Sequence, residues 1–347
     1  MFGRSTRRKF TDDRQFSYLQ SEQLKLESAT ITGWRDDNED THLATILSLP
    51  EIEGHPPLYL KMFGVFDGHG GGECSKVVSK KIVKWLMDSV AWKEYESQRQ
   101  ENIPATESDT DLMVKAALFE TFNSADTQPE MTGFKDQGTT CIIVVITSTS
   151  CIIANCGDSK AVLYGEDFEI LMETTEHRPD DPKERRRIIK NGGYIWDDRV
   201  CGDLSLTRAL GDIKYKMLNP EIQDLVKGSG EKVTGDLISA CPDITIFPID
   251  DVKKILLICD GYTECEDIDG ITRVLSKSKK SSKDTEKITG IQSLMQSSIE
   301  WGSKDNMTAI YIHLDEELDV FNGNDFSEIP HWSASELSGE TVALVEK

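Results

Sequence analysis

The protein has 347 residues, of which 39 are Lys or Arg and 61 are Asp or Glu, so its formal net charge is −22. This negative charge would repel a phosphodiester backbone and an anionic lipid surface, so we expect neither nucleic acid nor a membrane among its partners. With 38% apolar residues, the chain has the composition of a globular protein and enough length for a sizeable core.

The chain begins with a polar and basic segment, residues 1–22, which we expect to form an N-terminal tail. Its basic start has no apolar run behind it, unlike a secretory signal peptide. No run of about 18 apolar residues occurs in the sequence, so no transmembrane helix is predicted. We therefore expect a cytoplasmic or nuclear protein.

Short apolar runs rich in β-branched residues then recur, and they are typical of strands. In chain order they span residues 58–66, 139–147, 151–155, 161–164, 255–259 and 307–314. Residues 148–150 separate the second run from the third, and residues 156–159 separate the third from the fourth. Because such short connections favour hairpins, we expect antiparallel pairs here and no doubly wound parallel sheet.

Apolar residues at helical spacing predict amphipathic helices between these runs. The stripes, each expected to face the core, are Val78, Ile82, Trp85 and Leu86; Leu112, Ala116 and Phe119; and Ile288, Ile291, Met295 and Ile299. A further helix is predicted over residues 183–189, because Asp181 and Pro182 provide an N-cap and a first-turn proline.

The remaining segments are polar. Residues 93–110, 218–236 and 276–286 are typical of surface loops or insertions, and residues 315–347 form an acidic C-terminal extension. No repeat or break in composition divides the chain between the two tails, so we expect one domain over residues 23–314. The predicted fold class is α+β, with antiparallel sheets and amphipathic helices outside them.

Acidic residues gather where the predicted strands end. Asp67 and Asp260 each follow a buried strand and precede a glycine, and Asp305 with Asn306 opens another strand. A carboxylate in such a place is held rigidly while its oxygens face a cleft, and Mg²⁺ and Mn²⁺ take oxygen ligands. A single Asp-Gly pair is more typical of a turn, but its repetition favours a metal site.

Other sites fit these segments less well. A phosphate-binding loop at residues 68–72 would need Lys-Ser or Lys-Thr behind it, and Glu73 would place a negative charge where phosphate binds. A calcium loop that starts at Cys265 would have a thiol in place of its first carboxylate. The eight cysteines form no C-x-x-C pair, so neither a zinc site nor a redox motif is predicted.

In their order along the chain, these motifs resemble those of the metal-dependent protein serine/threonine phosphatases of type 2C. The resemblance covers roughly residues 24–314. It rests on Gly33-Trp34-Arg35 to Glu39-Asp40, Phe63 to Gly71, Gly138-Thr139-Thr140, Ala154 to Ser159, Leu206 to Asp212, Cys241-Pro242-Asp243, Asp260-Gly261 and Asp305 to Thr308. It implies a β-sandwich of two antiparallel sheets, flanked by pairs of helices, with a binuclear Mn²⁺ or Mg²⁺ centre at one end.

The resemblance also implies the ligands of the two ions. Asp67 would bridge both ions, and Asp260 and Asp305 would bind one of them. Glu39 and the backbone carbonyl of Gly68 would bind the other. A water between two such ions loses its proton near neutral pH and would attack phosphorus directly, so no covalent intermediate is expected.

Further residues of the family motifs surround this centre. Asp40 belongs to the expected metal centre, where it and Asn306 would orient ligands or bound water. Arg35 matches the arginine that binds the phosphate, because its planar fork can hold two phosphate oxygens. His69 matches the general acid that protonates the leaving serine or threonine oxygen.

The chain departs from the family pattern at one point. Family members usually continue Asp-Gly-x-Trp-Asp, whereas this chain has Asp260-Gly261-Tyr262-Thr263-Glu264. Glu264 and Asp158 match the ligands of a third, weaker ion, so a third site with altered affinity is expected. Arg208 and Asp212 lead into residues 213–236, the variable flap of the family, and we expect them to fix that loop.

The resemblance implies phosphoprotein substrates and a monomeric enzyme. One rival function is a catalytically silent, phosphatase-like module that binds and regulates a phosphoprotein or a kinase. Such a module should have lost ligands of the two main ions, and this chain keeps them. Another rival is a nucleotide-binding protein that uses residues 68–72, which a measurement of ATP affinity would test.

Overall fold

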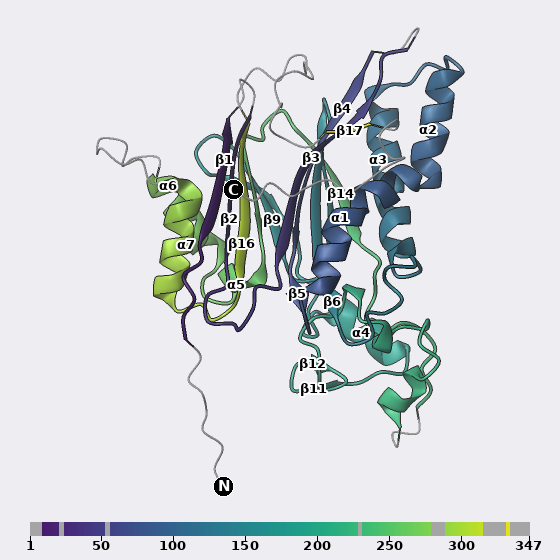
Figure 1. Cartoon of the computed structure of the whole chain (residues 1–347), viewed down its shortest axis with the longest axis vertical. Helices are drawn as coiled ribbons and strands as arrows, with labels where there is room; N and C mark the ends of the chain where they lie inside the picture. Colours follow the sequence, from purple (N-terminus) through teal and green to yellow (C-terminus); the bar gives the residue numbers. More distant parts are fainter. Residues whose placement is uncertain are drawn as a thin grey trace.

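Two β-sheets of six strands each pack face to face, and helices cover their outer faces (Figure 1). The computed structural model describes residues 9–20, 24–52, 56–227, 231–278, 289–314 and 331–333. The layers follow one another as helix, sheet, sheet and helix, so the predicted α+β sandwich is confirmed.

The first sheet is antiparallel throughout. Its strand order is β1 (Gln15–Gln20), β2 (Leu24–Ile31), β16 (Met307–Leu314), β15 (Lys254–Ile258), β9 (Lys160–Tyr164) and β10 (Ile170–Glu173). Helices α6 (Ile268–Ser278) and α7 (Gly290–Trp301) cover its outer face, at the left of Figure 1.

The second sheet is antiparallel except at one edge. Its order is β14 (Asp243–Pro248), β8 (Ser150–Cys156), β7 (Cys141–Ile146), β4 (Leu58–Phe66), β3 (Thr41–Leu49) and β17 (His331–Ser333). Strand β17 runs parallel to β3. The outer face is covered by α1 (Glu73–Asp88), α2 (Val90–Gln100) and α3 (Glu107–Ala125), at the right of Figure 1.

The inner strands are buried on both faces, which explains their unbroken apolar sequences. Every residue of β7 and β8 is buried. One hydrophobic core lies between the sheets and extends to α6 and α7, and another lies between the second sheet and α1 to α3. A strand covered on both sides needs apolar residues at nearly every position, not at every second one.

A smaller sheet and a subdomain close one end of the sandwich. The small sheet has the order β13 (Leu210–Gly211), β6 (Gly138–Thr139) and β5 (Gly68–His69). The subdomain, at the bottom of Figure 1, comprises α4 (Pro182–Lys190), β11 (Ile195–Trp196), β12 (Arg199–Val200), η1 (Ile213–Tyr215) and η2 (Ile222–Val226). Ile222, Val226 and Val233 are buried in its own small core, so the described residues of 218–236 belong to an insertion with packed side chains and not to a plain surface loop.

The apolar runs predicted as strands form β4, β7, β8, β9, β15 and β16, with small shifts at their ends. The predicted hairpin across residues 148–150 joins β7 and β8 and is confirmed. The predicted hairpin across residues 156–159 is wrong, because β8 and β9 belong to different sheets. Both edges of β8 are occupied by β7 and β14, so the connection crosses from one sheet to the other.

The predicted core stripe of α3 is also wrong. Leu112 is 57% exposed and Phe119 is 49% exposed, whereas Met113, Ala117 and Phe122 are buried. Apolar residues lie on several faces of this helix, so spacing alone does not identify the face that meets the sheet. The predicted loop at residues 93–110 instead contains most of α2 and the start of α3.

Both predicted tails contribute a strand to a sheet edge. Residues 15–20 form β1, and residues 331–333 form β17. The rest of the predicted C-terminal extension, together with residues 1–8 and 21–23, lies outside the described residues. Within the described part of the chain, no helix combines the length and the apolar character that a membrane span requires.

Candidate active site

The ends of four strands, two from each sheet, bring the acidic residues together. Asp67 follows β4, and Asp40 precedes β3, which pairs with β4 through Thr41 and Phe66. Asp260 and Asp305 are placed in the same way by the antiparallel strands β15 and β16 of the other sheet. The antiparallel pairings therefore collect the carboxylates at one end of the sandwich.

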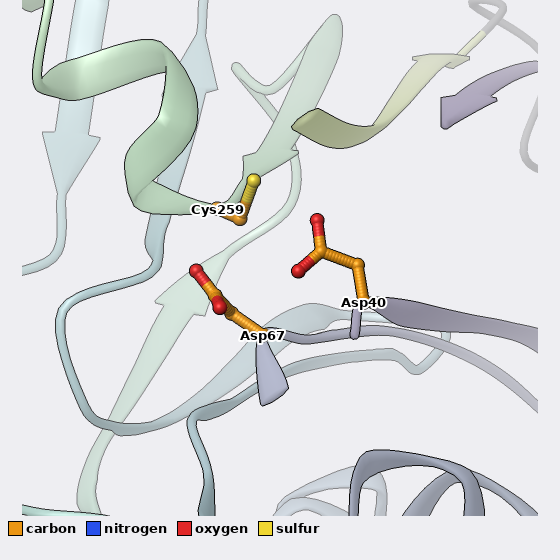
Figure 2. Close-up of side chains that lie close together, drawn as sticks. All are labelled: Asp40, Asp67 and Cys259. Atoms are coloured by element: carbon orange, nitrogen blue, oxygen red, sulfur yellow. The ribbon is translucent and has the colours of Figure 1, made fainter. Parts of the chain in front are cut away.

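One cluster of possible ligand atoms consists of Asp40, Asp67 and Cys259. These three residues offer ligand atoms that all lie within 4.8 Å of one another. Figure 2 shows both carboxylates and the thiol turned toward a common space. Both carboxylate oxygens of Asp40 are buried, and none of the described residues hydrogen-bonds to them. Burial raises the pKa of Asp40 to about 7.

A second cluster consists of Asp260, Glu264 and Asp305, whose carboxylate oxygens also lie within 4.8 Å of one another. Burial, followed by the charges of neighbouring carboxylates, raises the pKa of Asp67 and of Asp260 well above the usual range. Asp260 and Asp305 are half-buried, and Glu264 is exposed. Carboxylates this close together favour their charged forms only beside a compensating cation. The donor set therefore fits hard divalent ions such as Mg²⁺ or Mn²⁺.

The loop that carries Arg35 and Glu39 is held against this centre by Asn306. The Asn306 side-chain amide donates to the carbonyls of Thr32 and Asp37, at 2.9 and 3.0 Å. Its Oδ1 accepts from the backbone N–H of Glu39 at 3.0 Å. Asn306 thus orients the backbone at Glu39. The guanidinium of Arg35, whose side chain is 45% exposed, donates to the Asp305 carboxylate at the rim.

Glu39 belongs to neither cluster, but its backbone lies directly against Gly68. A Cβ atom on Gly68 would lie only 2.3 Å from the Glu39 carbonyl oxygen, so only glycine fits this contact. Asp67 is fixed by Thr140, whose hydroxyl accepts from the Asp67 N–H at 3.1 Å and whose N–H donates to the Asp67 carbonyl at 2.8 Å. The Gly138-Thr139-Thr140 motif therefore positions the central carboxylate.

His69 has a partner that sequence reasoning missed. Its Nε2 donates to Asp212 Oδ2 at 2.7 Å, since the carboxylate accepts. Asp212 adopts a left-handed backbone with φ 48°, and its N–H donates to the Gln137 carbonyl at 2.8 Å. A Cβ atom on Gly138 would lie 2.3 Å from Asp212 Oδ2 and 2.6 Å from His69 Nε2. A glycine is therefore required where β6 passes this pair.

The electrostatic effect of Asp212 on His69 opposes that of burial. Burial lowers the pKa of His69, but the charge of Asp212 and its hydrogen bond outweigh this effect and raise the pKa. No hydrogen bond of the described residues engages the other ring nitrogen, Nδ1, so that nitrogen is available to a ligand. The sequence placed Asp212 in a loop-fixing role, and only its backbone conformation and the pairing of β5 with β6 reveal the contact with His69.

Asp158 and Glu264, the expected ligands of a third ion, do not share a cluster. Glu264 lies with Asp260 and Asp305, as described above. Asp158 lies on the connection between β8 and β9 and faces Arg178, a residue that sequence reasoning did not select. No motif or spacing pointed to Arg178, because its position depends on how the segment after β10 packs against this connection.

Comparisons with known proteins identify the family of the chain. Residues 24–307 match the family model described as Protein phosphatase 2C. Probable protein phosphatase 2C 5 of Paramecium tetraurelia is 30% identical over 303 residues, which cover 84% of this chain and 93% of that protein. Protein phosphatase 1B of Bos taurus is 26% identical over 297 residues, which cover 83% of this chain and 56% of that protein.

Solved structures show the same fold. The crystal structure of serine-threonine phosphatase 2C from Toxoplasma gondii aligns with a TM-score of 0.63 and 20% sequence identity, over 88% of this chain and 100% of that chain. A second phosphatase structure from a pathogenic strain of Toxoplasma gondii aligns with a TM-score of 0.62 and 22% identity, over 88% of this chain and 96% of that chain.

Proposed function

Since the chain belongs to the protein phosphatase 2C family and is a metal-dependent protein phosphatase, we propose that its acidic centre would hold two divalent ions, which would activate a water molecule for hydrolysis of the substrate without a covalent intermediate. The substrates are phosphoserine and phosphothreonine in proteins. The observation that carries the proposal is the convergence of Asp40, Asp67, Asp260 and Asp305 at four strand ends, in two clusters of possible ligand atoms.

The two clusters and the family resemblance together support an assignment of residues to the ions. Asp67 lies in one cluster and close enough to Asp260 and Asp305 of the other for their charges to act on it, which supports its role as the shared ligand. Asp260 and Asp305 would hold one ion, and Glu39 with the Gly68 carbonyl would hold the other. Mn²⁺ or Mg²⁺ bound there would act as Lewis acids that make water nucleophilic near neutral pH.

The other residues bind and orient the reacting groups. Arg35 would release Asp305 and present its planar guanidinium to two phosphate oxygens, because both partners sit at the same exposed rim. His69 would give a proton from Nδ1 to the leaving serine or threonine oxygen, while Nε2 stays bonded to Asp212. Asp212 thus acts as a positioning residue that fixes the ring.

The site takes all of these residues from one chain, so the proposed reaction needs no residue from a second copy. The catalytically silent regulatory module is not favoured, because Glu39, Asp67, Asp260 and Asp305 are all present and Asp67, Asp260 and Asp305 lie together. A silent module would tolerate the loss of these buried charges, which destabilise the fold when no cation is present.

The direct test measures both dependence on metal and the absence of a phosphoenzyme. Hydrolysis of a phosphothreonine peptide is measured with Mn²⁺, and again after exhaustive chelation. A reaction with ³²P-labelled peptide is then quenched in acid and in alkali within one turnover, so that both acyl phosphate and phosphohistidine would be detected. We expect Mn²⁺-dependent release of phosphate and no label on the protein. Covalently bound label, or full activity after chelation, would overturn the proposal.

A further inference from the structure

We propose that the Arg178 guanidinium supplies the positive charge beside Asp158. It takes the place of the third metal ion that the family resemblance predicts there. The inference rests on the proposed function, because it concerns the charge balance of the same centre. The resemblance pairs Asp158 with Glu264, whereas in the structure Glu264 lies with Asp260 and Asp305, and Asp158 faces Arg178.

Arg178 lies between carboxylates that a third ion would use. Its Nη2 is 3.3 Å from Asp158 Oδ2 and 3.7 Å from Asp260 Oδ2. Its Nε is 3.1 Å from Glu176 Oε2. The Asp158 side chain is only 4% exposed, whereas the Arg178 side chain is 30% exposed, so the carboxylate is shielded from water and the arginine lies at the edge of the site. One guanidinium therefore neutralises part of the charge of three acidic residues.

The backbone that carries Arg178 is fixed beside Asp158. The preceding residue, His177, donates its N–H to the Gly157 carbonyl at 3.0 Å, and its Nδ1 accepts from the Gly157 N–H at 3.1 Å. The His177 carbonyl accepts from the Thr207 N–H at 2.9 Å. Because Gly157 directly precedes Asp158, these bonds tie the backbone of Arg178 to the backbone of its partner.

A divalent ion does not fit this arrangement together with Arg178. Mg²⁺ needs near-octahedral oxygen ligands at about 2.0–2.1 Å, and the guanidinium offers five N–H donors and no acceptor. The carboxylate oxygens that face Arg178 cannot bind the ion until the guanidinium leaves. A guanidinium and a divalent ion beside the same carboxylate would also repel each other. The site beside Asp158 is therefore closed to a third ion as long as Arg178 stays in place.

The test is the number of Mn²⁺ ions that the purified full-length chain binds, measured by equilibrium dialysis with detection of free Mn²⁺ by electron paramagnetic resonance. We expect two ions for the wild type and three for Arg178→Ala, in which Asp158 and Asp260 lose their fixed cation. The double variant Arg178→Ala/Asp158→Ala should bind two again. Arg185→Ala removes an arginine from the exposed side of α4 and should bind two, as the matched control.

A second measurement does not depend on the stability of the Arg178 variant. Asp158→Ala alone should still bind two Mn²⁺ ions, because the wild type holds no third ion. Three ions in the wild type, falling to two in Asp158→Ala, would overturn the inference while leaving the two-metal function intact. A folded Arg178→Ala chain that still binds only two ions would also overturn it. A wild type that binds no Mn²⁺ would instead overturn the proposed function.

Discussion

The buried carboxylate of Glu184 provides a quantitative test of how the subdomain beside the site is held. Glu184 on α4 is only 1% exposed. Its Oε1 accepts from Arg208 Nη2 at 2.7 Å, and its Oε2 accepts from Arg187 Nη2 at 3.0 Å and from the Thr207 hydroxyl at 3.1 Å. Because Arg208 and Thr207 precede β13 and Asp212, this network connects α4 to the segment that orients His69.

The expected size of the effect follows from the pKa of Glu184. Burial raises this pKa, but the hydrogen bonds and charges of Arg208 and Arg187 outweigh burial and lower it from 4.5 to about 2. A carboxylate with a lowered pKa in the folded state stabilises the fold above its unfolded pKa, and this stabilisation is lost as pH falls through the folded value. The difference corresponds to about 3 kcal/mol of unfolding free energy at pH 7.

Glu184→Gln removes this charge while keeping the size of the side chain. We expect urea unfolding, followed by circular dichroism, to show a loss of about 3 kcal/mol at pH 7 that shrinks to roughly half by pH 3. Glu94→Gln on the exposed side of α2 serves as the control and should change stability by less than about 0.5 kcal/mol. An equal loss for Glu184→Gln at both pH values would refute the reasoning, because it would show that ionisation of Glu184 contributes nothing.

Three further predictions concern the His69 pair. His69→Gln should slow hydrolysis of a phosphothreonine peptide by about 10²- to 10⁴-fold. Hydrolysis of an aryl phosphate should slow much less, because the aryl group leaves without a proton. Equal losses on the two substrates would exclude a role of His69 as general acid. Asp212→Asn keeps the size of the side chain but removes its charge. We therefore expect a loss of about 10-fold in kcat for the peptide and a smaller loss for the aryl phosphate. Unchanged peptide kinetics would contradict the positioning role of Asp212. Gly138→Ala forces a Cβ atom against the side chains of Asp212 and His69. A melting experiment should therefore show about 1–3 kcal/mol of destabilisation. Wild-type stability together with wild-type activity would show that glycine is not required at this contact.

Local patterns in the sequence were sufficient for the six most deeply buried strands of the two large sheets and for the choice of Asp67 and Asp260 as candidates, but not for strands such as β2, β3 and β14. Strands such as β7 and β15 are buried on both faces, so their apolar runs stand out without knowledge of the fold. Asp67 and Asp260 could be selected because each ends such a run and precedes a glycine. The proximity of these carboxylates depends on how the strands pair. The resemblance to a family supplied that information, whereas spacing alone did not.

Features that depend on packing between distant segments were not predictable. The connection from β8 to β9 has the length of a hairpin, but it crosses between sheets because β8 is already paired on both edges. The face of α3 that carries Leu112 is apolar yet exposed, because the opposite face fills the core. The contacts of Asp212 with His69 and of Arg178 with Asp158 join segments more than 15 residues apart that no short motif links.

The most direct test of the central claim is the binding of Mn²⁺ to the wild type and to Asp67→Asn, measured beside the hydrolysis of a phosphothreonine peptide. If Asp67 is the ligand that both ions share, the substitution weakens both sites, because each loses a charged oxygen donor. We predict two tight Mn²⁺ ions and Mn²⁺-dependent turnover for the wild type. For Asp67→Asn we predict much weaker binding of both ions and a loss of several orders of magnitude in activity, with an unchanged circular dichroism spectrum. A folded Asp67→Asn protein that still binds two ions tightly and turns over at the wild-type rate would contradict the binuclear centre.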